Sequence, residues 1–335
     1  MKIQLSLLAS VALAGVTATD TAPEQVHIAL AGQDGDGDPT GFTFAWFTQD
    51  TASSEVEYSV TAIDGTVTNG TANGTSTQYL DDHGYHHAVR ATGWPADAKV
   101  TYRVGSDADG WSPYFSTRMA PDKDTDRTIK LSVFGDMGYS DSDHRKMIVT
   151  ADGLVKTWSA EYSRQTLEAL KNNGDIEMVW HVGDIGYADD AFAHDPVEFL
   201  YEKAYNGYMN WLQNLTSIMP YMVSVGNHES ECHSAVCIAE LKTALALSNF
   251  SAYNTRWRMP SEESGGHPGS NMWYSWNYGP VHFVSVNTET DFPGAGEERT
   301  GDSHFPWLKA GGFGYKGEYL QWVENDLKVL PHAQR

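Results

Sequence analysis

Residues 176–187 read IEMVWHVGDIGY, an apolar run that ends in Gly followed by Asp. A short apolar run bounded by a turn signal is typical of a buried strand in an α/β protein. A similar run ends in Gly-Asp at residues 129–136, and another ends in Gly-Asn at residues 221–227. Helices predicted at residues 161–170 and 195–215 separate the runs. This alternation of strands and helices predicts a layered α/β domain.

Each run ends in a residue whose side chain carries a metal-ligating oxygen: Asp136, Asp184 or Asn227. Ligands bind at the carboxyl ends of strands in open α/β sheets, so residues far apart in the sequence can converge there. The glycine before each of them permits a sharp turn where the chain leaves the strand. Taken singly, each dipeptide is better explained as a turn. Three of them in order at strand ends predict a shared binding site.

The neighbours of these ligands carry a resemblance to a known family. GDMG at residues 135–138, GDIGYAD at 183–189 and GNHE at 226–229 resemble the first three sequence blocks of the binuclear metallophosphoesterases. The tyrosine in the second block resembles that of the purple acid phosphatase branch. The segment PEQVHIALAG at 23–32 is similar to the start of that family's N-terminal domain. The resemblance covers about residues 23–335 of the chain.

The resemblance implies a role for each residue. Asp136 and Tyr187 would bind Fe(III), and the Tyr187 phenolate would give the purple colour. Asp184 would bridge this ion to a divalent Zn, Mn or Fe ion, which Asn227 would bind. His228 would stabilise the phosphate or protonate the leaving group. Oxygen ligands suit these ions, and two adjacent ions can activate water for hydrolysis; the alternative is turn residues, a core tyrosine and a helix-start histidine.

The family completes its site with V-x-x-H and then G-H-x-H. We identify neither block, and no two of the 13 histidines have the H-x-H spacing. By the family's pattern the iron site would lack one histidine and the second site two. The chain ends at Arg335 after a helix predicted at residues 318–330. Because losing the last strands would expose sheet edges, we expect a fragment rather than a natural pseudoenzyme, weakly active or inactive as it stands.

The part of the chain before the α/β pattern has a different character. Residues 24–120 contain short apolar runs between Gly, Asp, Asn and Thr clusters, without a helical period. This pattern predicts a β-sandwich of the fibronectin type III kind. The polar segment MAPDKDTDR at 119–127 is interpreted as a linker. The catalytic domain is then expected at 128–335, incomplete at its C-terminus.

The first 18 residues predict a signal peptide. Lys2 precedes an apolar stretch at residues 3–16 that is too short to span a bilayer, and small residues follow it. In an oxidising compartment Cys232 and Cys237 are expected to form a disulfide; a metal site with His233 would lack a fourth ligand. Secretion would also permit glycosylation at four sequons, which begin at Asn69, Asn73, Asn214 and Asn249.

Charge excludes some classes of partner. Acidic residues outnumber basic ones 44 to 22, for a formal net charge of -22. Such a chain repels nucleic acid and anionic membranes, so a phosphate site here needs metal cations. We therefore expect a secreted acid phosphatase that hydrolyses small phosphoric monoesters. The alternatives are a phosphodiesterase of the same fold and a non-catalytic glycoprotein that binds a partner through its β-domain.

Overall fold

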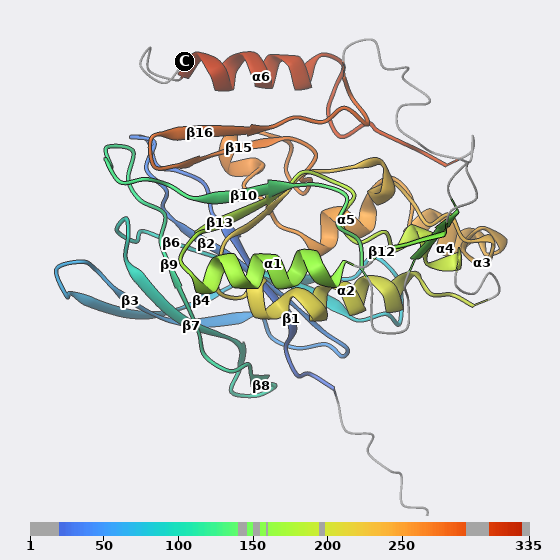
Figure 1. The fold of residues 1–335 in the computed structure, drawn as a ribbon, viewed down its shortest axis with the longest axis horizontal. Helices are drawn as coiled ribbons and strands as arrows, with labels where there is room; N and C mark the ends of the chain where they lie inside the picture. The colour runs from blue at the N-terminus through green and yellow to red at the C-terminus, as the bar shows by residue number, and fades with distance from the viewer. Residues whose placement is uncertain are drawn as a thin grey trace, which may run out of the picture.

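We describe the protein from a computed structural model that covers residues 20–139, 146–149, 155–158, 160–193, 198–292 and 308–329. The predicted signal peptide lies outside these residues. Figure 1 shows the strands of the N-terminal domain below the α/β domain, with α6 (Glu318–Val329) at the opposite end of the molecule. In the described part of the chain, no helix is long and apolar enough to cross a membrane.

The N-terminal domain consists of nine strands: β1 (Glu24–Leu30), β2 (Gly41–Thr48), β3 (Glu55–Thr61), β4 (Val67–Asn73), β5 (Thr75–Thr77), β6 (Tyr85–Thr92), β7 (Lys99–Ser106), β8 (Gly110–Trp111) and β9 (Phe115–Arg118). One antiparallel sheet has the order β1-β2-β6-β5 and the other β4-β3-β7-β8, with β9 paired to β7. Between the sheets, the Phe44 ring lies 4.5 Å from Tyr102 and 6.0 Å from Trp94. This buried aromatic layer confirms the predicted β-sandwich.

The second domain contains a three-stranded parallel sheet, consistent with the predicted α/β layers. Its strands β10 (Leu131–Phe134), β13 (Met178–His181) and β14 (Tyr221–Val223) lie in that order. Phe134 pairs with His181, and His181 with Val223, so the three strands end together. Two antiparallel hairpins accompany the sheet: β11 (Lys146–Val149) with β12 (Val155–Trp158), and β15 (Tyr274–Tyr278) with β16 (Val281–Ser285).

Helices cover this sheet. Figure 1 shows α1 (Glu161–Asn172) beside α2 (Tyr201–Thr216) on one side, while α6 lies beyond the β15–β16 hairpin on the other. The short elements are η1 (Asp189–Ala193), η2 (Asn227–Glu229), α3 (Ala235–Ala239), α4 (Leu241–Ala246), α5 (Ser251–Arg256) and η3 (Glu262–Ser264). The helix predicted at residues 195–215 corresponds to α2, which begins at Tyr201 after non-helical residues 198–200; residues 195–197 lie outside the described residues. Its buried stripe starts at Tyr201 and continues through Tyr205 and Tyr208, so packing sets the helix start.

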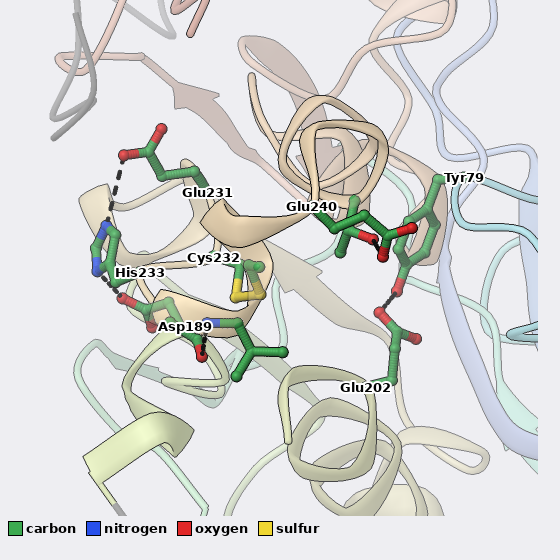
Figure 2. The surroundings of a disulfide bond; sticks show 11 residues. Tyr79, Asp189, Glu202, Glu231, Cys232, His233 and Glu240 are labelled. Carbon is green, nitrogen blue, oxygen red and sulfur yellow. Dashed lines mark hydrogen bonds and ion pairs between the residues drawn. A yellow bond between two sulfur atoms is a disulfide. The ribbon is translucent and has the colours of Figure 1, made fainter. Parts of the chain in front are cut away.

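A buried polar cluster joins the two domains. We call it the Arg256 cluster: Gln25, Tyr79, Glu202 and Arg256. The Arg256 guanidinium donates from Nη2 to Glu202 Oε2 (2.7 Å), from Nε to the Tyr79 hydroxyl (2.9 Å) and from Nη1 to Gln25 Oε1 (3.3 Å). The Tyr79 hydroxyl in turn donates to Glu202 Oε1 over 2.6 Å (Figure 2). The arginine side chain is 0% exposed, so its charge is balanced inside the protein.

Candidate metal centre

The ends of β10 and β13 bring two predicted metal ligands to one tyrosine. The Tyr187 hydroxyl donates to Asp136 Oδ1 over 2.9 Å and lies 3.4 Å from Asp184 Oδ2. Backbone pairing continues beyond the strands, since Asp136 N–H donates to the Gly183 carbonyl and Gly138 N–H to the Ile185 carbonyl. The structure therefore brings together three of the four predicted metal ligands, as the strand-end pattern indicated.

The backbone at these residues adopts an uncommon conformation. Asp136, Asp184 and Tyr187 have φ angles of 58°, 52° and 51°, in the left-handed region. A residue other than glycine held there costs about 1–3 kcal/mol, and such residues gather at functional sites. A Cβ at Gly183 would lie 2.9 Å from the Gly226 Cα, so the two loops approach each other as closely as only glycine allows.

Glu229 connects the loops that follow β13 and β14. Its carboxylate accepts backbone N–H bonds from Ile185 (2.8 Å), Gly226 (2.8 Å) and Asp184 (3.0 Å). The side chain is buried, and burial, together with the negative charges of Asp184 and Asp189, raises the pKa of Glu229 to about 8 although N–H bonds oppose this. Sequence reasoning quoted this residue within GNHE but gave it no role. Its only sequence signal is its place in GNHE, directly after His228.

His228 lies beside Asp184 and Tyr187. Its backbone N–H donates to Asp184 Oδ1 over 3.2 Å, and its ring centroid lies 4.2 Å from that of Tyr187. Its Nδ1 lies 2.7 Å from Asp189 Oδ2. Burial opposes the positive charge, but the hydrogen bond and charge of Asp189, aided by Asp184 and Asp190, raise the pKa of His228 to about 9. Asp189 thus fixes both the orientation and the charge of this imidazole.

Asn227, the fourth predicted metal ligand, begins η2 between Gly226 and His228, half-buried at the same edge of the sheet.

The structure describes some of the other histidines and not others. His181 and His282, expected as buried strand residues, are confirmed: His181 Nδ1 lies 2.8 Å from the Tyr221 hydroxyl, and the His282 side chain is 4% exposed. Four others lie outside the described residues: His144, His194, His304 and His332.

One statement made from the sequence was wrong. The V-x-x-H spacing does occur after the third block, at Val329-Leu330-Pro331-His332. It follows directly on the last residues of α6 rather than on a further described strand. His332 is outside the described residues, so this match has no structural description. The H-x-H spacing remains without an example in the 335 residues.

The charges at the strand ends test whether a cation fits. No Lys or Arg of the described segments pairs with Asp136 or Asp184. Burial, with the neighbouring Asp136 carboxylate, raises the pKa of Asp184. Burial and both carboxylates raise the pKa of Tyr187 well above its ordinary value. Two carboxylates and a phenol with raised pKa values at Asp184 and Tyr187 suit a hard cation, which would favour the ionised forms of both.

A second group of possible ligands lies nearby. Asp189, Asp190 and His233 have ligand atoms within 4.8 Å of one another. His233 lies inside the loop closed by Cys232 and Cys237, which form the predicted disulfide (Figure 2). A tetrahedral or octahedral site needs further ligands from water or protein. The disulfide places this group next to His228 without involving the strand-end oxygens.

The four sequons lie in different surroundings. Asn69 and Asn73 are exposed on β4, the edge strand of its sheet, and Asn214 is exposed on α2. Asn249 is half-buried with φ 53°. Its Oδ1 accepts the Gly311 N–H (2.7 Å), and its Nδ2 donates to the Gly311 carbonyl (3.4 Å). Glycosylation of Asn249 would disturb these bonds. The first three sequons therefore remain the stronger predictions.

Two family models match this chain. Residues 23–119 match the purple acid phosphatase N-terminal domain, and residues 129–328 match the calcineurin-like phosphoesterases. Similar proteins include probable purple acid phosphatase 20 of Arabidopsis thaliana, 31% identical over 92% of this chain and 56% of the relative. Acid phosphatase type 7 of Homo sapiens is 29% identical, over 86% of this chain and 54% of the relative.

A solved structure supports the fold. Purple acid phosphatase from yellow lupin seeds, 17% identical, superposes with a TM-score of 0.55 over 92% of this chain and 49% of that chain. The strand-end site and the match over residues 129–328 define the class, that of the calcineurin-like phosphoesterases. With its N-terminal domain, the chain belongs to the purple acid phosphatase family, whose members generally use a binuclear metal centre. The chain spans about half the length of these relatives, 56% of the plant protein and 54% of the human one.

Proposed function

We propose that this chain carries part of the active centre of a secreted acid phosphatase that hydrolyses small phosphoric monoesters. The observation that carries the proposal is the convergence of Asp136, Asp184 and Tyr187 beside His228. The family supports phosphatase chemistry, and the names of the relatives support acid phosphatase activity. The formal charge of -22 supports a need for metal cations, because the protein otherwise repels phosphate.

The metal ligands in this proposal are oxygen atoms. Asp136 and Tyr187 would hold Fe(III), Asp184 would bridge to a divalent Zn, Mn or Fe ion, and Asn227 would hold that second ion. When bound, such an ion pair supplies Lewis acidity and lowers the pKa of water. The left-handed backbone at three of these residues supports the assignment, because it holds the side chains toward a common point before any ion arrives.

The proton chemistry rests on His228. With a pKa of about 9, its imidazole is protonated at mildly acidic pH. The bond from Nδ1 to Asp189 keeps one proton on that nitrogen and turns Nε2 away from the carboxylate. His228 would therefore hold a second proton at Nε2, where it can neutralise phosphate charge or protonate the leaving alcohol.

Secretion is part of the proposal. The Cys232–Cys237 disulfide fits an oxidising compartment, and three sequons are exposed. No H-x-H block is present, so we expect weak turnover or none from these 335 residues. One alternative is a phosphodiesterase of the same fold, so a phosphodiester is also tested as a substrate. The other is a non-catalytic glycoprotein, which predicts that the chain binds no metal.

The experiment is metal reconstitution followed by an assay. The chain is loaded with Fe(III) and Zn or Mn, and its visible spectrum and hydrolysis of an aryl phosphate monoester and diester are measured near pH 5. We expect a phenolate-to-iron absorption band that Tyr187→Phe abolishes and that Tyr162→Phe, an exposed tyrosine on α1, retains. Absence of metal binding would overturn the proposed centre. Robust turnover would instead refute the inference that histidine ligands are lacking.

A further inference from the structure

The disulfide loop that follows η2 presents a second histidine to the site. Cys232 and Cys237 are both buried and close a loop of six residues that contains His233. Ser234 follows and caps α3, accepting the Val236 N–H at its hydroxyl over 3.3 Å. His233 is thus held between a covalent link and a helix start, and its side chain is only 13% exposed.

Both imidazoles meet at one oxygen atom. His233 Nδ1 lies 2.9 Å from Asp189 Oδ2, and His228 Nδ1 lies 2.7 Å from the same atom. The rings are 6.5 Å apart at an angle of 61°, so they approach from different directions. On its far side, His233 Nε2 lies 4.0 Å from the buried Glu231 (Figure 2). Glu231, His233, Asp189 and His228 therefore form one chain of polar contacts.

The Asp189 side chain is 0% exposed, so bulk solvent does not reach it. A carboxylate with one donor can rotate about its side-chain bonds, whereas two donors that converge on one oxygen fix it. Ring orientation of a functional histidine depends on the group that binds its other nitrogen. A displaced Asp189 carboxylate would thus change the orientation of the His228 ring.

We propose that His233 is a positioning residue of the phosphate site: it fixes Asp189, which fixes His228, and the Cys232–Cys237 disulfide keeps His233 in place. This proposal rests on the proposed function for the role of His228. It adds a residue outside the three sequence blocks to the site. It also gives the disulfide a function in the site, because reduction would release the loop that presents His233.

The first test does not depend on turnover. Long-range ¹H–¹⁵N spectra of the histidine-labelled, metal-free chain would show a protonated, hydrogen-bonded Nδ1 for both His228 and His233. We expect His233→Ala to shift the His228 ring resonances while those of His27 on β1 and His87 on β6, both in the N-terminal domain, stay unchanged. Unmoved His228 resonances in a folded His233→Ala chain would overturn the proposal. Circular dichroism checks the fold.

Two near-isosteric variants separate positioning from packing. In His233→Asn the amide nitrogen takes the place of Nδ1, whereas in His233→Gln it takes the place of Nε2. We expect Asn to restore the wild-type His228 resonances and Gln to leave them shifted. Equal effects of the two variants would contradict a role through Asp189. The double variant Cys232→Ser/Cys237→Ser should resemble His233→Ala; a wild-type His228 spectrum in it would rule out the part assigned to the disulfide.

Where the metal-loaded wild type turns over substrate, we expect His233→Ala to lower kcat roughly tenfold with KM little changed, and His233→Asn to recover most of it. Unchanged kcat in His233→Ala would refute the positioning role. A wild-type chain without turnover or metal binding would count against the proposed function alone, because the spectra still decide whether His233 orders His228.

Discussion

The Arg256 cluster and the strand-end site both bring acidic side chains together, but only in the first is a buried carboxylate paired with a buried arginine. In the cluster, Glu202 is matched by Arg256 at 2.7 Å and receives a further bond from Tyr79. At the strand ends, the exposed Asp136 and the half-buried Asp184 share the Tyr187 hydroxyl, and Asp184 also accepts the His228 backbone N–H. Backbone strain does not distinguish the two, since Gln25 also has a positive φ of 58°.

The difference indicates what each region is for. A buried acid balanced from within joins two domains and needs nothing else. At the strand ends, burial and the Asp136 carboxylate raise the pKa of Asp184 although His228 opposes this, so a metal cation bound there would favour the ionised carboxylate. The first region is thus complete in the folded chain, and the second is completed by its ligand. Each prediction below tests this contrast.

The largest effect is expected on removal of the internal cation. Arg256→Met leaves Glu202 buried with no charge partner and should lower the free energy of unfolding by about 3–5 kcal/mol. Urea denaturation measures this. The matched control is Arg258→Met, which breaks a partly exposed ion pair to Glu263 and should cost under about 1 kcal/mol. Similar costs for both variants would break the contrast.

Addition of a cation should stabilise the other region by a comparable amount. At 100 times the dissociation constant, a bound ion adds about 2.7 kcal/mol to the free energy of unfolding. We expect Zn or Mn with Fe(III) to raise the melting temperature of wild type but not of Asp184→Asn. Asp175→Asn, which removes an exposed pair with Lys130, should respond like wild type. A full response in Asp184→Asn would place the ions elsewhere.

The free energy of unfolding of the metal-free chain should depend on pH through His228 and Glu229. The folded pKa of His228 is about 9 against an ordinary 6.5, so its stabilisation is complete below pH 6.5 and lost as pH rises through 9. Glu229, raised to about 8, acts in the same direction between about pH 4.5 and 8. We expect a loss of about 1–3 kcal/mol from pH 6.5 to 9 in EDTA, smaller in His228→Gln and unchanged in His267→Gln. Rising stability over this range would contradict the assignment.

The smallest effects on the free energy of unfolding are expected at two sequon asparagines, which carry no charge. Asn73→Gln lies on an exposed edge strand and should change the free energy of unfolding by less than about 0.5 kcal/mol. Asn249→Gln removes a left-handed residue bonded to Gly311 and should cost about 1–2 kcal/mol in the unglycosylated protein. Equal costs would mean that the Asn249 bonds contribute little. Glycopeptide mapping after secretory expression should find sugar at Asn73 and not at Asn249.

Much of the fold was predictable, because strand-end glycines and apolar runs are local signals. The runs that end at Gly135, Gly183 and Gly226 each became a strand of one parallel sheet. The start of α2 was missed, because its buried stripe and not its cap signal decides where the helix begins. Glu229 and Asp189 were missed as site residues, because their roles depend on backbone N–H groups and imidazoles from other segments.

The sequence by itself determined the class of the protein, the order of its two domains, the disulfide and the residues that form the strand-end site. These follow from periodicity, turn chemistry and short motifs, which act over a few neighbouring residues. Only the tertiary structure decided which charges are balanced: Arg256 reaches Glu202 from 54 positions away, and Asp189 lies 39 positions before His228. Such pairing depends on burial and on distances across the fold, and no local pattern in the chain records either.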